Sequence, residues 1–398
     1  MTTKHPAVAS ISGFHDELTG IRRDIHAHPE PGFEENRTAK LVADRLESFG
    51  IEVHRGIAKT GVVGVLHGKG GPTGRSIGLR ADMDCLRMTE ANTFAHRSTY
   101  HGLMHGCGHD GHTTMLLGAA RYLASTRRFD GTAYFIFQPA EEGPGGGAVM
   151  IAEGLFERFP AERIFGLHNW PELPAGKMAI VTGPAMAACD EFRIAIRGRG
   201  GHAAKPHHLK DPVLVAAHLI TALQSVVSRN VHPLDSAVVS VAQVDTSGST
   251  AFNVIPERVG MLGTARTFRP ETRDTVEERI KQLARSIAAA FDAEAEVEYA
   301  RGYPATVNDA TQAAFATEVA RKVFGADNVL TDVFPTMGGE DFAYMLEKRP
   351  GAYCWLGQGD GGAGRLLHTA QYDFNDEVLP FGAGFLAALV ETALPAGK

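Results

Sequence analysis

Hydrophobic and polar residues follow two different periods along the first half of the chain. Apolar residues recur every three or four positions in several stretches, which predicts amphipathic helices at 15–28, 34–49, 113–123 and 149–159. Short and largely apolar runs lie between them, which predicts strands at 51–53, 61–66, 76–83, 132–137 and 163–167. Strands that alternate with helices in this way predict an α/β sandwich.

The pattern changes near residue 187. From there, strands with one apolar and one polar face are expected at 191–197, 236–244, 258–266 and 295–300, with helices at 211–229 and 270–291. Their order, β-α-β-β-α-β, is typical of the ferredoxin-like fold. We therefore expect an inserted domain at 187–300 that divides the main domain into 1–186 and 301–398, with an exposed sheet edge that could pair with another copy.

Composition narrows the possible partners. The 398 residues are 44% hydrophobic and 21% charged, and the formal net charge is −7. An acidic balance argues against nucleic acid as a partner, and no apolar run is long enough to predict a membrane span. The cysteines are scattered, none forms a C-x-x-C pair, and the first residues do not resemble a signal peptide. A reducing cytoplasm is the expected location.

The densest chemistry lies at 104–112, where the sequence reads MHGCGHDGH. Cys107 and His109 are separated by one residue, so an extended turn could aim both side chains at one point. Thiolate, imidazole and carboxylate are the ligands that first-row divalent metals prefer. We expect Gly106, Gly108 and Gly111 to let the backbone wrap closely around an ion. The alternative is a surface loop rich in glycine and histidine, or a set of buried core histidines.

Other polar segments follow predicted strands. They are 82–84 with the sequence Asp-Met-Asp, the pair Glu141-Glu142, the segment 168–170, and His368 near the end of the chain. In open α/β sheets, ligands bind at the carboxyl ends of the strands, so these segments are expected to converge. Adjacent carboxylates resist burial unless they are paired or bound to metal, although Glu141-Glu142 could also belong to a solvated loop.

Taken together, these motifs make the chain similar to the zinc-dependent aminoacylase/carboxypeptidase superfamily. Within it, the chain resembles the branch of hippurate hydrolases, N-acyl-amino-acid amidohydrolases and indoleacetyl-amino-acid hydrolases. The matching segments run through the whole chain in order, at 23–30, 79–84, 104–112, 138–142, 167–169, 200–204, 253–256, 263–266 and 338–342. The resemblance implies a metal-dependent exopeptidase-like catalytic domain with an inserted ferredoxin-like domain for dimerisation and for covering the site.

The resemblance also implies roles for individual residues. Two divalent metal ions would share the ligands Cys107, His109, Glu142, His168 and His368. Glu141 would be the general base, and Asp84 would orient the ligands. His202 would reach the site of a neighbouring subunit, and Asn253 and Arg266 would contact the substrate near its carboxylate. The expected reaction is hydrolysis of an N-acyl amino acid by a homodimer or a dimer of dimers.

Some choices stay open at this level. A thiolate ligand favours zinc, but manganese, cobalt or nickel could occupy such a site. A dipeptidase on the same scaffold, a metal-binding protein without catalysis and a hydrolase using Cys107 as nucleophile are the alternative functions. Family members usually have Asp-Ala-Leu-Pro where this chain has 84–87 as Asp-Cys-Leu-Arg, and many have Ser-Pro where it has Thr369-Ala370. These departures leave the acyl group and side-chain preference of the substrate undecided.

Overall fold

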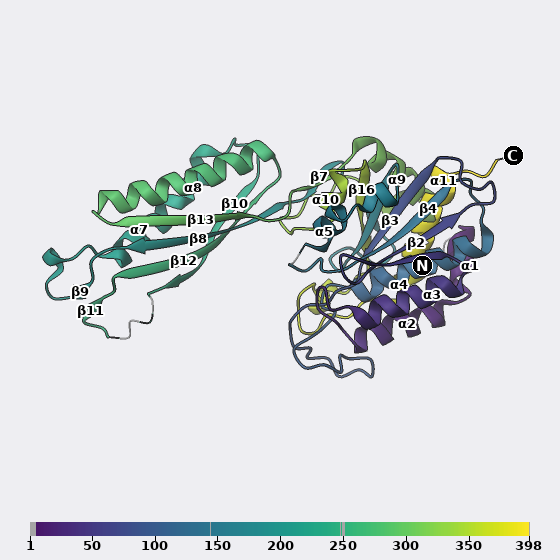
Figure 1. The fold of residues 1–398 in the computed structure, drawn as a ribbon, viewed down its shortest axis with the longest axis horizontal. Helices are drawn as coiled ribbons and strands as arrows, with labels where there is room; N and C mark the ends of the chain where they lie inside the picture. Colours follow the sequence, from purple (N-terminus) through teal and green to yellow (C-terminus); the bar gives the residue numbers. More distant parts are fainter. Residues whose placement is uncertain (1–4, 144, 247, 249–250, 398) are drawn as a thin grey trace. The chain divides into compact units, whose positions relative to one another are not determined.

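The fold is that of a computed structural model, which describes residues 5–143, 145–246, 248 and 251–397. The chain forms two compact units. Unit 1 comprises Met1–Ala185, Val307–Phe334 and Asp341–Lys398, and unit 2 comprises Met186–Thr306 and Pro335–Glu340. The inserted domain was expected at 187–300, so unit 2 extends slightly beyond that range and also takes in a short later segment. The ribbon in Figure 1 shows both units.

Unit 1 is built on an eight-stranded mixed sheet in the order β1-β2-β4-β3-β5-β16-β6-β15. The strands are β1 (Glu52–Ile57), β2 (Gly61–His67), β3 (Ser76–Asp82), β4 (Thr132–Gln138), β5 (Ile164–Trp170), β6 (Met178–Ala179), β15 (Val329–Leu330) and β16 (Gly351–Gly357). The central strands β4, β3, β5 and β16 run parallel to one another. Every residue of β3, β4 and β16 is buried, as is usual for central parallel strands covered on both faces.

Helices of unit 1 form a connected layer on this sheet. They are α1 (Pro6–Ser12), α2 (His15–Ala27), α3 (Asn36–Ser48), α4 (His109–Thr126), α9 (Ala310–Phe324) and α11 (Leu379–Ala393). Three shorter helices form a second group that contacts β4, namely α5 (Gly146–Ala152), α6 (Leu155–Arg158) and α10 (Ala343–Leu346). The single helix expected at 149–159 was therefore wrong: α5 and α6 are separate, because Gly154 adopts a left-handed φ of 83°.

Unit 2 is a four-stranded antiparallel sheet in the order β10-β12-β8-β13. Its main elements are β8 (Ala188–Arg197), α7 (Pro212–Ser225), β10 (Ala237–Asp245), β12 (Arg258–Thr267), α8 (Pro270–Ala290) and β13 (Glu294–Arg301). Both helices pack against this sheet (Figure 1), and Phe192, Ile194 and Ile196 of β8 point into the core they form. Strand order and chain order together confirm the expected ferredoxin-like fold.

Smaller elements complete unit 2 and the connections. The strands β9 (Gly201–His202) and β11 (Val254–Ile255) pair with each other, while β7 (Gly183–Met186) and β14 (Thr306–Asn308) contain the residues where the chain passes between the units. By length and composition, Pro212–Asn230 could cross a membrane. However, Val215, Leu219 and Leu223 from this stretch are buried in the core of unit 2, as in the core helix of a globular domain.

Candidate metal centre

The candidate site lies at the carboxyl ends of the parallel strands of unit 1. Asp82 is the last residue of β3, Glu141 and Glu142 follow β4, and His168 is two residues before the end of β5. Because β4, β3 and β5 are neighbours in the sheet, their ends bring these side chains to one edge. The structure thus unites the segments that the sequence placed after strands.

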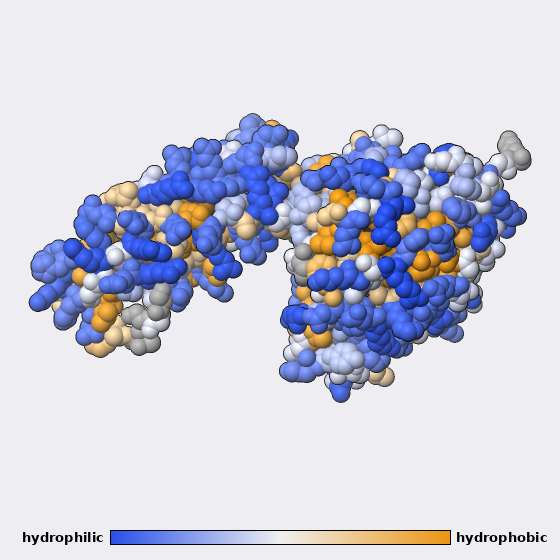
Figure 2. Space-filling view, in the orientation of Figure 1, coloured by the Kyte–Doolittle hydropathy of each residue, from blue (hydrophilic) through white to orange (hydrophobic). Residues whose placement is uncertain are grey.

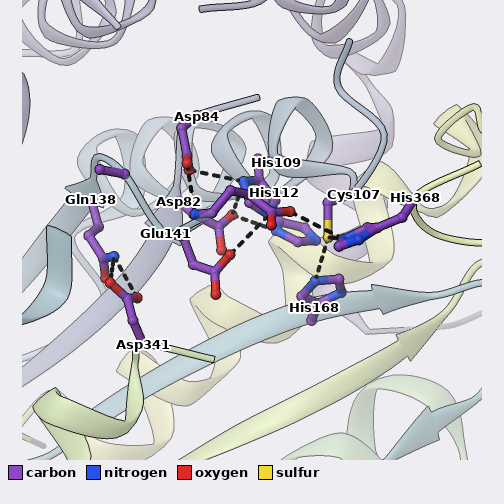
Figure 3. Close-up of polar contacts among 12 residues, drawn as sticks. Asp82, Asp84, Cys107, His109, His112, Gln138, Glu141, His168, Asp341 and His368 are labelled. Atoms are coloured by element: carbon purple, nitrogen blue, oxygen red, sulfur yellow. Dashed lines mark hydrogen bonds and ion pairs between the residues drawn. The ribbon is translucent and has the colours of Figure 1, made fainter. Parts of the chain in front are cut away.

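Cys107 is at the centre of the cluster (Figure 3). Its buried Sγ lies 3.4 Å from His168 Nε2 and 3.4 Å from His368 Nε2. The backbone carbonyl of Asn169 lies 2.6 Å from Nδ1 of His168, so this nitrogen must be the donor and Nε2 keeps its lone pair toward Cys107. Burial, together with the nearby Glu142 and Glu141 carboxylates, raises the pKa of the Cys107 thiol. A bound cation would reverse this effect, since it favours the thiolate.

His109 is the first residue of α4, and its ring is buried. Nδ1 lies 3.2 Å from Asp84 Oδ1, while Nε2 lies 3.9 Å from Glu142 Oε1 and 4.0 Å from Glu141 Oε2. Burial alone would lower its pKa, but Asp82 and Asp84 outweigh burial and raise the pKa of His109 to about 10. A proton on His109 therefore balances the surrounding carboxylates, as a cation would.

The side chains present fit a pair of divalent metal ions. Ligand atoms of Cys107, His109 and His168 lie within 4.8 Å of one another, and so do those of Cys107, Glu142 and His368. Atoms bound to one ion at about 2.0–2.3 Å are about this far apart or closer. The Nε2 atom of His109 is buried and has no hydrogen-bond partner within the described parts of the chain, which suits a metal ligand. Cys107 is common to both groups.

His368 reaches the cluster from a strained turn. Its φ is 60°, in the left-handed region that residues other than glycine rarely adopt, and its backbone N–H donates to the carbonyl of Gly106 over 2.8 Å. Nε2 of His368 lies 3.3 Å from Glu142 Oε1. Burial would raise the pKa of Glu142, but the contacts with His368 and His109 lower it overall. Strained backbone conformations of this kind are most frequent at functional sites.

The glycines of the Cys/His segment allow neighbouring side chains to pack closely. A Cβ atom on Gly111 would lie 2.2 Å from the ring of Phe374, and one on Gly108 would lie 2.2 Å from Asn169 Oδ1. Their expected role, to let the backbone wrap closely around an ion, stays a prediction. The segment is also not wholly a loop: helix α4 begins at His109, four residues earlier than the predicted helix at 113–123.

A buried polar network next to the candidate ligands was not assigned a role from the sequence. Asp82 Oδ1 lies 2.6 Å from His112 Nδ1, and its Oδ2 accepts a hydrogen bond of 2.6 Å from Arg80. Arg80 also donates to Asp341, which belongs to the distant motif at 338–342. The available signal was an arginine inside a largely apolar strand, since a buried guanidinium requires acidic partners.

The remaining predicted residues lie in unit 2. His202 is exposed on β9, opposite Val254 of β11, and the carbonyl of Asn253 accepts a hydrogen bond from Ala203. Arg258 is the first residue of β12, and Arg266 is the last residue but one. A strand of this length separates Arg258 from Arg266 by about 27 Å. Asn253 precedes Val254, which pairs with His202, and it is only five residues before Arg258, so Asn253 lies nearer to His202 than to Arg266.

Comparison with known proteins identifies the family of this chain. Residues 78–392 match the family described as peptidase family M20/M25/M40. The chain belongs to this family. A hippurate hydrolase from Campylobacter jejuni is 43% identical over 96% of this chain and 97% of its own length. The IAA-amino acid hydrolase ILR1-like 4 from Arabidopsis thaliana is 39% identical over 97% of this chain and 88% of its own.

A solved structure supports the same assignment. The YXEP protein from Bacillus subtilis, described as a dinuclear metal binding peptidase of the M20 family, superposes with a TM-score of 0.82 and 35% identity. The match covers 96% of this chain and 99% of that one. These findings confirm the family resemblance inferred from the motifs and the expected fold class. The protein is a metal-dependent amidohydrolase of this family.

Proposed function

We propose that the protein hydrolyses the amide bond of N-acyl amino acids and releases a carboxylic acid and a free amino acid. The observation that carries the proposal is a buried carboxylate, Glu141, held beside a second carboxylate that belongs to a metal-ligand cluster. A metal site without catalysis needs Glu142 but has no use for its neighbour. The names of the hippurate and IAA-amino acid hydrolases support the substrate class, because both describe acylated amino acids.

The ligands in this proposal are Cys107, His109, Glu142, His168 and His368, shared between two divalent ions. Zinc suits the thiolate and imidazole donors best, with manganese, cobalt or nickel as alternatives. Such ions, when bound, polarise an amide carbonyl and lower the pKa of water from about 15.7 toward about 7. We place the enzyme in the cytoplasm, since all four of its cysteines are free.

Glu141 is the general base in this proposal. Its carboxylate accepts a proton from the attacking water and passes it to the leaving amine, a role worth about 10²–10⁴-fold in rate. The Glu141 side chain is only 9% exposed, and its Oε2 lies 4.0 Å from His109 Nε2, so it is fixed beside the ligands before substrate binds. Burial also limits access of bulk water to the transferred proton.

His202 would stabilise the developing oxyanion in the site of a second copy. Its Nδ1 accepts a hydrogen bond of 3.2 Å from the backbone N–H of Ala204, so the ring proton is on Nε2, where it can be donated. Asn253 and Arg266 would contact the substrate carboxylate. Because the two residues are far apart in unit 2, they can share one carboxylate only if they come from different chains. This separation supports a homodimer as the active form.

Subunit mixing tests the dimer. His202→Ala and Glu141→Gln should each be nearly inactive, yet a mixed dimer has one site with Glu141 from one chain and His202 from the other. Random exchange should restore about a quarter of wild-type activity, since half of the dimers are mixed and each has one working site. No recovery despite demonstrated subunit exchange would place His202 in the site of its own chain or outside catalysis.

A hydrolysis screen tests the substrate class. Metal-reconstituted protein is incubated with N-acetyl, N-benzoyl and indoleacetyl amino acids and with unblocked dipeptides, and free amino acid is quantified. The proposal expects a higher kcat/KM for at least one N-acyl amino acid than for any dipeptide. Faster hydrolysis of dipeptides would instead identify a dipeptidase on this scaffold.

A further inference from the structure

The turn that presents Glu141 and Glu142 has an unusual backbone. Ala140 lies between β4 and Glu141 with a φ of 55°, in the left-handed region that disfavours residues with a Cβ atom. Its carbonyl accepts a hydrogen bond of 2.9 Å from Gly146, which closes the turn. A conformation of this kind persists only when its surroundings hold it in place.

A carboxylate from a distant segment holds this turn. Glu35, the residue before α3, has no exposed surface, and its Oε1 accepts the backbone N–H of Ala140 over 2.8 Å. Its Oε2 accepts a hydrogen bond of 2.6 Å from the hydroxyl of Thr60, which fixes the plane of the carboxylate. Ala140 is also fully buried, so its N–H has no access to water if Glu35 is removed.

A second carboxylate holds the other side of the same turn. Asp84 Oδ2 accepts the backbone N–H of Glu142 over 2.9 Å, while Oδ1 of the same side chain faces His109 (Figure 3). Hydrogen bonds therefore fix the backbone N–H groups of the residues immediately before and immediately after Glu141. Both hydrogen bonds are short and come from backbone N–H groups, so these two anchors leave the direction of the Cα–Cβ bond of Glu141 little freedom.

We propose that Glu35 is a positioning residue, which sets the orientation of Glu141 through the N–H of Ala140. This inference rests on the proposed role of Glu141 as the base. Glu35 itself touches neither the ligand cluster nor the reacting atoms; it acts through the backbone. Loss of this anchor would let the turn relax, and displacement of a reacting group by about 1 Å can cost about 10²-fold in rate.

A nearby glutamate provides a matched control. Glu30 lies in the same segment, and its two carboxylate oxygens accept the backbone N–H groups of Arg37 and Thr38 in the first turn of α3. Glu30 therefore stabilises a helix end, and its side chain makes no hydrogen bond to the described residues of the turn that carries Glu141. Burial raises the pKa of Glu35 to about 7, so a neutral side chain is readily accommodated at that position. Glutamine can accept from Ala140 and donate to Thr60, which makes Glu35→Gln the conservative variant.

The experiment measures kcat, KM and metal content for Glu35→Ala, Glu35→Gln and Glu30→Ala on metal-reconstituted enzyme, with Glu141→Gln as the reference. We expect Glu35→Ala to lower kcat about 10–100-fold, with KM within about threefold of wild type and metal content unchanged. Glu35→Gln should retain kcat within about threefold. Glu30→Ala should lower the melting temperature but not kcat.

Several results would overturn the inference. They are a wild-type kcat in Glu35→Ala, equal losses of kcat in Glu35→Ala and Glu30→Ala, and a Glu35→Gln variant as slow as Glu35→Ala. If Glu35→Ala does not fold, Thr60→Val tests the same anchor: kcat should fall about 3–10-fold, and an unchanged kcat counts against the proposal. A fully active Glu141→Gln would instead refute the proposed function, which separates the two failures.

Discussion

Replacement of Asp84 by asparagine should weaken metal binding without unfolding the protein. Asp84 uses both carboxylate oxygens, one toward His109 Nδ1 at 3.2 Å and one toward the N–H of Glu142 at 2.9 Å. An asparagine offers one acceptor oxygen and turns an NH₂ group toward the other donor. Either His109 loses the partner that keeps its Nδ1 protonated, or the backbone of Glu142 loses its anchor.

The size of the effect follows from the hydrogen bond that is lost. A hydrogen bond to a charged group contributes about 1.5–3 kcal/mol. At about 1.4 kcal/mol per tenfold, that loss corresponds to a decrease of about 10–150-fold in metal affinity. The range agrees with the roughly 10–100-fold that residues supporting a metal ligand usually contribute.

The assay is competition between the protein and a chelator of known affinity, with zinc and with manganese. Circular dichroism and the melting temperature check that the variant is folded. Asp274→Asn is the matched control, because Asp274 is an exposed residue of α8 that pairs with Arg301 in unit 2. An Asp84→Asn protein that binds metal within twofold of wild type would refute the reasoning.

Further predictions concern the base, the substrate and pH. Glu141→Gln should keep its metal but lower kcat by about 10² or more; if it loses metal while Glu142→Gln does not, the two roles are reversed. Arg266→Ala should raise KM more for N-acyl amino acids than for their amides, whereas equal increases would argue against carboxylate recognition. Burial would lower the pKa of His26, but Asp110 and Glu90 raise it from 6.5 to about 9. The stabilisation that protonated His26 gains from these carboxylates is therefore complete below pH 6.5 and is lost as the pH rises through 9. The free energy of unfolding of wild type should fall by up to about 3 kcal/mol more than that of His26→Gln between pH 7 and 10, and parallel curves would contradict this.

The sequence predicted elements with a clear period better than those without one. Helix α8 was predicted at 270–291 and spans Pro270–Ala290, and the strands of unit 2 lie within a few residues of their predicted positions. Helix α11 was not predicted, because it is apolar on all sides and so has no period to read. Strand β16 was missed as well, although it pairs with β5 beside the site. On the face that Figure 2 shows, hydrophilic side chains predominate around smaller hydrophobic patches, and the buried framework cannot be seen.

The candidate ligands were easier to predict than the residues that hold them. Cys107, His109 and Glu142 stand in dense motifs whose chemistry can be read directly. Glu35 contacts Ala140 across 105 positions of sequence, and nothing in its local pattern indicates this contact. The distance between Arg266 and Asn253 likewise depends on strand register, which the sequence alone does not supply.

The central claim is that this cluster performs metal-dependent amide hydrolysis. The most direct measurement is the rate of amino-acid release from the best N-acyl amino acid substrate, before and after removal of metal and during stepwise addition of zinc or manganese. The proposed centre predicts that chelated protein is inactive, and that activity returns and levels off near two equivalents of metal per chain. Chelated protein with no detectable metal and full activity would contradict the account.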